Sequence, residues 1–202
     1  MSRRPINRLL LVLANPENPQ DKRGSLLKEL AQNYRDHSIQ AGVEVDFLDL
    51  YREGYNPVHY PHRRDTQTIE YQIRLQKADK VAFFHPVWWG SVPGILKGFL
   101  DKVLSVDFTG QSYPSTPKIL AGKSASVFAL GVDPQWKITY FYNNHLEVFW
   151  SRLVFDRVGL SGSLTYFGNY EQVSKSQINR WFRQVQRLAK KQNTRNNLFD
   201  LV

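Results

Sequence analysis

The chain has 202 residues, which is long enough for one domain with a substantial core and short for two. Hydrophobic residues make up 42% of it and charged residues 22%, a globular composition that argues against wholesale disorder; cysteine is absent, which excludes disulfide and thiolate chemistry. The net charge is +9, and no stretch approaches the roughly 20 apolar residues of a membrane span. We therefore expect one domain over residues 1–202, cytoplasmic and not inserted in a membrane.

Five short segments predict β-strands. In residues 8–14, Arg8 is followed by a continuous apolar run, as is typical of a strand covered on both faces. Residues 43–50 alternate apolar and acidic side chains, which indicates a strand nearer the edge of a sheet. A third apolar segment lies at residues 80–86, and two more follow at residues 124–131 and 162–168.

Helical segments separate these strands. Leucine, tyrosine and isoleucine form one stripe in residues 24–42, and further helices are predicted at residues 66–77 and 91–104. The aromatic-rich residues 139–159 predict one long helix. Strands joined through helices imply right-handed crossovers. We therefore predict a three-layer α/β domain, with a five-stranded parallel sheet in the order 2-1-3-4-5 and helices on both faces.

A basic helix is expected after the fifth strand, with residues 192–202 as a tail outside the core. Apolar residues from Ile178 to Ala189 recur at helical spacing, so one face of this helix should dock on the domain. Seven positive charges lie in the segment with no acid between them: Lys175, Arg180, Arg183, Arg187, Lys190, Lys191 and Arg195. We interpret them as a solvated basic face, with an acidic or anionic partner as the alternative. No base-reading motif is present, and we predict no nucleic-acid binding.

Ligands of parallel α/β sheets bind beyond the carboxyl ends of the strands, so the loops after the first, third and fourth strands should converge on one crevice. The first loop contains neither G-x-G-x-x-G nor G-x-x-x-x-G-K-[ST]. It offers Asn18, Arg23 and Ser25 just before a helix, whose free amides suit a phosphate. A polar loop capped by Ser25 is an equally good interpretation.

Two adjacent tryptophans, Trp88 and Trp89, follow the third strand. Neighbouring loop side chains point in different directions, so burial in the core explains at least one of them poorly. A phosphate site beside an aromatic wall suits a flat phosphorylated ring system. Packing in the core or in a dimer interface is the alternative.

Residues 78–103 resemble the signature of the flavodoxin-like NAD(P)H:quinone oxidoreductases, an apolar strand followed by P-[LM]-x-W-x-x-x-P-A-x-L-K-G-[WF]-x-D-[RK]-V. The matching residues are Pro86, Trp89, Pro93, Ile95, Leu96, Lys97, Gly98, Phe99, Asp101, Lys102 and Val103. The segment LLLVLANPENP, at residues 9–19, is similar to the family's first strand and loop. The resemblance implies the flavodoxin-like three-layer α/β/α sandwich, a flavin lying across the three loops and a homodimer that completes each site.

The resemblance also implies which residues contact the cofactor, which would be FMN or alternatively FAD. The flavin ring would meet Pro86, Val87, Trp88, Trp89 and Gly90. Its phosphate would meet Asn15, Asn18, Arg23 and Ser25, and the fourth-strand loop would supply Leu130, Gly131 and Val132. Backbone amides can stabilise charge that develops on the reduced ring, and an aromatic wall excludes water, which is the role expected of Trp89. No metal site is expected.

Two positions depart from the family pattern. The family's first-loop histidine is Asn15 here, which donates a hydrogen bond but does not change charge near neutral pH. The family's T-T-G-G loop is ALGV here, which lacks two hydroxyls and one glycine. Tyr140 and His145 are the candidates for the family's catalytic tyrosine and histidine, and the alternative is one packed or exposed helical face. Lys97 and Asp101 are expected to form a surface ion pair without a chemical role.

The predicted function is a flavin-dependent oxidoreductase that takes two electrons from NAD(P)H and passes them as hydride to a quinone or similar flat acceptor. The alternative is a non-enzymatic flavin- or nucleotide-binding regulatory protein, similar to the ancillary proteins of glutathione-gated potassium efflux systems. The ALGV loop and the basic helix favour this alternative. We also expect a homodimer, because pairing would cover an aromatic excess. These aromatic residues are Tyr140, Phe141, Tyr142, Phe149 and Trp150.

Overall fold

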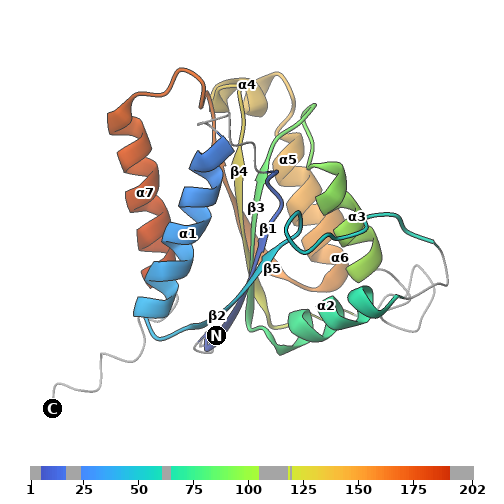
Figure 1. Cartoon of the computed structure of the whole chain (residues 1–202). Helices are drawn as coiled ribbons and strands as arrows, with labels where there is room; N and C mark the ends of the chain where they lie inside the picture. Colours follow the sequence, from blue (N-terminus) through green and yellow to red (C-terminus); the bar gives the residue numbers. More distant parts are fainter. Residues whose placement is uncertain (1–5, 17–23, 61–64, 105–117, 119, 192–202) are drawn as a thin grey trace, which may run out of the picture.

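The computed structural model of the chain describes residues 6–16, 24–60, 65–104, 118 and 120–191 (Figure 1). Its centre is a five-stranded sheet in the order β2-β1-β3-β4-β5, in which all neighbouring strands are parallel. The strands are β1 (Arg8–Leu13), β2 (Glu44–Asp49), β3 (Lys80–Pro86), β4 (Ser124–Leu130) and β5 (Ser161–Phe167). The sheet order and the parallel strand direction predicted from the sequence are confirmed.

Helices cover both faces of the sheet, as Figure 1 shows. One layer consists of α1 (Gly24–Gln40) and α7 (Lys175–Lys190), which lie side by side. The other layer consists of α2 (Thr66–Lys77), α3 (Gly94–Val103), α5 (His145–Val148), the π-helical segment η2 (Phe149–Phe155) and α6 (Asp156–Val158). The short helix α4 (Gln135–Tyr140) lies near the carboxyl ends of the strands.

The strand β1 shows why these strands are apolar throughout. Leu10 and Val12 pack into the core on the α2–α3 side, whereas Leu9, Leu11 and Leu13 pack into the core on the α1–α7 side. All five side chains are fully buried. The continuous apolar run is therefore the consequence of a sheet covered by helices on both faces.

The single long helix predicted for residues 139–159 is wrong. The chain leaves α4 after Tyr140, and Asn143 and Asn144 then have φ angles of 49° and 50° before α5 begins at His145. Asparagine is among the few residues that tolerate this left-handed conformation, because its short polar side chain can hydrogen-bond locally. The two asparagines break the helix and turn the chain at the carboxyl edge of the sheet.

The aromatic residues of this segment have two different environments. Trp150, expected to belong to an exposed patch, is fully buried against Phe83, with ring centroids 4.9 Å apart. Tyr140 and Phe141, in contrast, are 77% and 72% exposed. Trp150 is therefore a core residue, and only the part of the segment before α5 leaves large aromatic surface uncovered.

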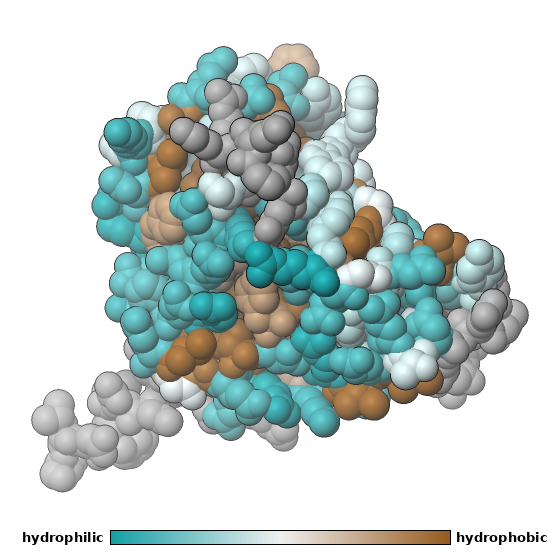
Figure 2. Space-filling model, viewed as in Figure 1, coloured by the Kyte–Doolittle hydropathy of each residue, from teal (hydrophilic) through white to brown (hydrophobic). Residues whose placement is uncertain are grey.

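The basic helix α7 docks by its apolar face, as predicted. Trp181, Val185 and Ala189 are buried against α1 and the sheet, and the Ser174 hydroxyl caps the helix by accepting a hydrogen bond from the Gln177 amide. Figure 2 shows mostly hydrophilic residues on this flank of the molecule. Across the part of the chain that the structure describes, none of the helices has the length and apolar character that crossing a membrane requires.

Candidate functional site

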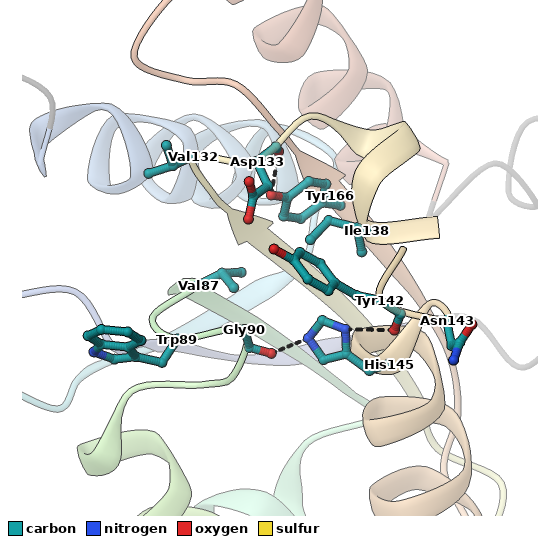
Figure 3. Close-up of a pocket in the computed structure, with 10 residues that line it drawn as sticks. All are labelled: Val87, Trp89, Gly90, Val132, Asp133, Ile138, Tyr142, Asn143, His145 and Tyr166. Atoms are coloured by element: carbon teal, nitrogen blue, oxygen red, sulfur yellow. Dashed lines mark hydrogen bonds between the residues drawn. The ribbon is translucent and has the colours of Figure 1, made fainter. Parts of the chain in front are cut away.

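A pocket of about 650 Å³ lies beyond the carboxyl ends of β3, β4 and β5 (Figure 3). The sheet register explains its position, because Pro86 at the end of β3 pairs with Leu130 at the end of β4, and Leu130 pairs with Phe167 of β5. The loops that follow these strands therefore start side by side. The residues that line the pocket are Val87, Trp89, Gly90, Val132, Asp133, Ile138, Tyr142, Asn143, His145 and Tyr166.

The loop after β3 contains a tight reverse turn at its tip, and residues 86–91 are called the tryptophan loop below. The amide of Trp88 donates to the carbonyl of Ser91 at 3.0 Å, and the amide of Ser91 donates to the carbonyl of Trp88 at 2.9 Å. Trp89 and Gly90 between them have φ angles of 50° and 72°. Two positive φ angles inside such a pair are the mark of a type I′ turn.

Trp89 is an unusual residue for this turn. A bulky side chain at positive φ is strained, at a cost on the order of 1 kcal/mol, and such outliers are concentrated at functional sites. Its side chain has no burial to offset this strain, because it is completely exposed, whereas Trp88 is 44% exposed. The turn therefore presents the indole of Trp89 to the solvent at the rim of the pocket.

The inner end of the tryptophan loop is fixed by the core. Trp150 Nε1 donates to His85 Nε2 at 3.2 Å, and His85 Nδ1 lies 2.9 Å from the carbonyl oxygen of Pro86. Burial lowers the pKa of His85 to about 4, so this imidazole is neutral near pH 7 and carries its proton on Nδ1, which donates to Pro86. A buried aromatic side chain on η2 thus holds the first residue of the loop through His85.

The outer end of the loop contacts the helix break. His145 Nε2 hydrogen-bonds to the carbonyl oxygen of Gly90, and His145 Nδ1 lies 3.2 Å from the carbonyl oxygen of Tyr142. Figure 3 shows the imidazole between these two carbonyls. A Cβ atom at Gly90 would come within 3.1 Å of His145 Nε2, so the close approach and the positive φ both favour glycine here.

The opposite wall comes from the loop after β4 and from the end of β5. The Tyr166 hydroxyl donates to the carbonyl of Asp133 at 2.7 Å, and the Asp133 carboxylate pairs with Lys137 at 2.6 Å. Burial, with a smaller contribution from the charge of Asp133, raises the pKa of Tyr166. A Cβ atom at Gly131 would come within 2.2 Å of the Tyr166 hydroxyl, so glycine is needed at this one position of the ALGV loop.

The structure brings some of the predicted site residues together. Val87, Trp89, Gly90, Val132 and His145 all line the pocket. Four other predicted residues lie on the same loops or strand ends without lining it: Pro86, Trp88, Leu130 and Gly131.

Other predicted residues lie elsewhere. Tyr140 does not line the pocket, whereas Tyr142, two residues later, does, as does Tyr166 of β5. Asn15 is buried just after β1, and Ser25 is exposed in the first turn of α1, inside the helix and not at its cap. Asn18 and Arg23, predicted to contact a phosphate, lie outside the described residues.

The sequence interpretation missed five lining residues: Asp133, Ile138, Tyr142, Asn143 and Tyr166. Asp133 could have been found, because it directly follows the fourth-strand loop that was expected to face the crevice. The Asn143-Asn144 pair was a signal for the helix break that brings Tyr142 into the pocket. Tyr166 could have been expected from the parallel sheet, since it stands near the carboxyl end of the fifth strand.

The composition of the pocket suits a flat, partly polar ring. Its apolar side chains Val87, Val132 and Ile138 and its aromatic rings surround a volume within the range of small-molecule sites. The carboxylate of Asp133, which lines the pocket, forms an ion pair with the Lys137 ammonium group. Within the described ranges, no group of three or more histidine, aspartate or glutamate residues is placed to hold a metal ion. The apolar and aromatic lining residues, with the hydroxyl groups of Tyr142 and Tyr166 among them, could hold a planar organic ring such as a flavin.

The chain is similar to known oxidoreductases. The "Uncharacterized NAD(P)H oxidoreductase YcaK" of Escherichia coli (strain K12) is 28% identical over 138 residues, which cover 63% of this chain and 66% of that protein. An FMN-dependent NADH:quinone oxidoreductase of Caldicellulosiruptor saccharolyticus is 27% identical over 111 residues, which cover 48% of this chain and 53% of that protein. The chain thus spans about half to two thirds of the length of these curated relatives.

Solved structures and a family model agree with the observed fold. The crystal structure of Smu.1420 from Streptococcus mutans UA159 has a TM-score of 0.78 at 25% identity, with 91% of this chain and 99% of that chain covered. The family model for the flavodoxin-like fold matches residues 7–177. Because this match covers most of the chain and the sheet has the corresponding strand order, the chain belongs to the family of proteins with the flavodoxin-like fold.

Proposed function

We propose that this protein is a flavin-dependent oxidoreductase that takes two electrons from NAD(P)H and passes them as hydride to a quinone or a similar flat acceptor. The observation that carries the proposal is the pocket at the carboxyl edge of the sheet, bordered by the strained, exposed Trp89. The names of the two relatives, an NAD(P)H oxidoreductase and an FMN-dependent NADH:quinone oxidoreductase, support it. They also favour an enzyme over a flavin-binding regulatory protein.

FMN is the proposed cofactor, with FAD as the alternative, and a bound flavin would supply the hydride-accepting and hydride-donating chemistry. The backbone of residues 86–90 would contact one edge of its ring, and residues 130–132 would contact the opposite side. The start of α1, with Ser25 in its first turn, would receive the phosphate. Trp89 and Tyr142 would exclude water from the reacting face.

A homodimer in the cytoplasm is proposed as the functional state. Large aromatic side chains gather around the pocket and are exposed in the single chain. They are Trp88, Trp89, Trp136, Tyr140, Phe141 and Tyr142. Association through a two-fold axis would cover such a surface. The sequence contains no cysteine, which is compatible with a reducing compartment.

The first experiment is a visible absorption spectrum of the purified protein, followed by chromatography of the released flavin to distinguish FMN from FAD. Anaerobic addition of NADPH or NADH should then bleach the flavin, and a quinone such as menadione should restore its colour. A yellow protein that neither nucleotide reduces would support the regulatory alternative. A protein that binds neither flavin after reconstitution would contradict the proposed enzyme and leave only a nucleotide-binding regulatory protein.

A further inference from the structure

The two ring nitrogens of His145 both face backbone carbonyl oxygens, those of Gly90 and Tyr142. A carbonyl oxygen can only accept a hydrogen bond, so a proton on either ring nitrogen is donated to the backbone, and we assign the proton of the neutral ring to Nε2, which faces Gly90. From this geometry we propose that His145 is a positioning residue that holds the tip of the tryptophan loop, and is not the proton donor of the reaction. The effect of His145 on catalysis rests on the proposed flavin site, whereas the hydrogen bond between His145 and Gly90 does not.

Proton transfer and loop positioning are incompatible roles for this imidazole. A neutral histidine has one N–H group, and with the proton assigned to Nε2 that group donates to the Gly90 carbonyl. Giving this proton to a substrate would remove the hydrogen bond, and a carbonyl oxygen cannot return the proton. In the doubly protonated form, the Nδ1 proton would point at the Tyr142 carbonyl in the same way. In either protonation form, the N–H groups of His145 therefore donate to backbone carbonyl oxygens.

The contact joins two segments that are otherwise held by backbone hydrogen bonds within each segment, between Trp88 and Ser91 in the turn and from Asn144 to Ile138 at the helix break. Gly90 and Trp89 form the strained centre of the turn, and Tyr142 precedes the left-handed Asn143 and Asn144. His145 is 55 residues from Gly90 in the chain and links the turn to the start of α5. Through this link the backbone of the turn that carries Trp89 is held at the pocket, which both Trp89 and Tyr142 line.

The tryptophan loop is then held by one histidine at each end. His85 donates to the carbonyl of Pro86, and His145 donates to the carbonyl of Gly90. His85 is completely buried and is held in turn by Trp150. His145 is partly exposed, so its contact is the one that solvent and ligand can reach.

Two amide variants separate positioning from proton transfer. In His145→Gln, the side-chain amide nitrogen lies at about the reach of Nε2, so it can donate to Gly90 but does not titrate. In His145→Asn, the amide nitrogen corresponds to Nδ1 and falls short of Gly90. The first measurement is hydrogen–deuterium exchange of the amides of Trp88 and Ser91 in flavin-free protein. We expect exchange about tenfold faster in the asparagine variant, and its restoration towards the wild-type rate in the glutamine variant.

The second measurement is the flavin dissociation constant and the pH profile of quinone turnover in the same variants. Positioning predicts that glutamine restores most of the flavin affinity and turnover that asparagine loses. Equal loss of turnover in both variants, with wild-type exchange rates, would show that His145 is a proton donor and would overturn the inference. Wild-type exchange in the asparagine variant would overturn it as well. The exchange experiment needs no flavin, so it decides the role of His145 even if the proposed function fails, and thermal melting controls for folding.

Discussion

The inner and outer ends of the tryptophan loop are held by the same chemistry in opposite environments. At the inner end, His85 and Trp150 are completely buried and their hydrogen bonds are shielded from water. At the outer end, Trp89 is fully exposed, its backbone is strained and His145 is partly exposed. The inner end therefore contributes stability, whereas the strained outer end lowers stability and exposes an aromatic ring at the pocket.

Loss of the inner anchor should have the largest effect. Trp150→Ala removes a fully buried side chain that packs on Phe83, His85 and Phe155. We expect the free energy of unfolding to fall by about 3–5 kcal/mol, a large part of the total for a domain of this size. Urea denaturation measures it. Trp136→Ala, at a residue 56% exposed, is the matched control and should cost less than about 1 kcal/mol.

A loss below about 1 kcal/mol in Trp150→Ala would show that Trp150 does not anchor the loop.

The pH dependence of stability tests the buried histidine of the inner end. His85 has a folded-state pKa of about 4, below the value of about 6.5 of an unfolded chain. As the pH falls from about 6.5 to about 4, the unfolded chain binds a proton that the folded chain excludes. The free energy of unfolding should therefore decrease by about 1.4 kcal/mol per pH unit across this window. Denaturation curves between pH 4.5 and 7.5 measure the slope.

His85→Leu should lower stability at pH 7, because Trp150 Nε1 and the Pro86 carbonyl lose their partner, and it should flatten this slope. A slope that persists in the variant would assign the proton uptake to other groups.

A substitution at the outer end should affect stability and binding in opposite directions. Asparagine tolerates positive φ, so Trp89→Asn should raise the free energy of unfolding of flavin-free protein by about 1 kcal/mol. The same change removes the aromatic ring, and flavin binding should become several-fold weaker. Thermal melting and fluorescence titration with FMN measure the two quantities.

Trp88→Ala is the comparison for this prediction, since it alters the neighbouring ring without relieving the positive φ. Unchanged flavin affinity in Trp89→Asn would mean that the exposed indole is not part of the site.

The smallest effect is expected just beyond the loop, on α3. Lys97 and Asp101 form the predicted ion pair at 2.5 Å, and both side chains are about half exposed. Lys97→Ala should lower the free energy of unfolding by no more than about 0.5 kcal/mol and leave flavin affinity unchanged. A clear loss of flavin binding in this variant would give Lys97 a role that its contacts do not indicate.

The sheet and the edge of it at which a ligand should bind could be predicted from the sequence. A strand that is buried on both faces has a continuous run of apolar residues, as β1 and β3 have. Together with the helices predicted between the strands, these runs predicted the parallel sheet. The carboxyl-edge rule predicted that the loops after the first, third and fourth strands converge on one crevice. Val87, Trp89 and Gly90 of the third loop and Val132 of the fourth line the pocket, whereas residues 17–23 of the first loop lie outside the described residues. These inferences need only patterns within short segments.

Tertiary structure alone decided how the side chains of the site meet. Tyr142 replaces Tyr140 in the pocket because two left-handed asparagines end the helix early. The partner of His85 is 65 residues away, and that of His145 is 55 residues away. Hydrogen bonds of this kind depend on which atoms the packed layers bring within 3 Å or so, and periodicity along the chain carries no information about that distance.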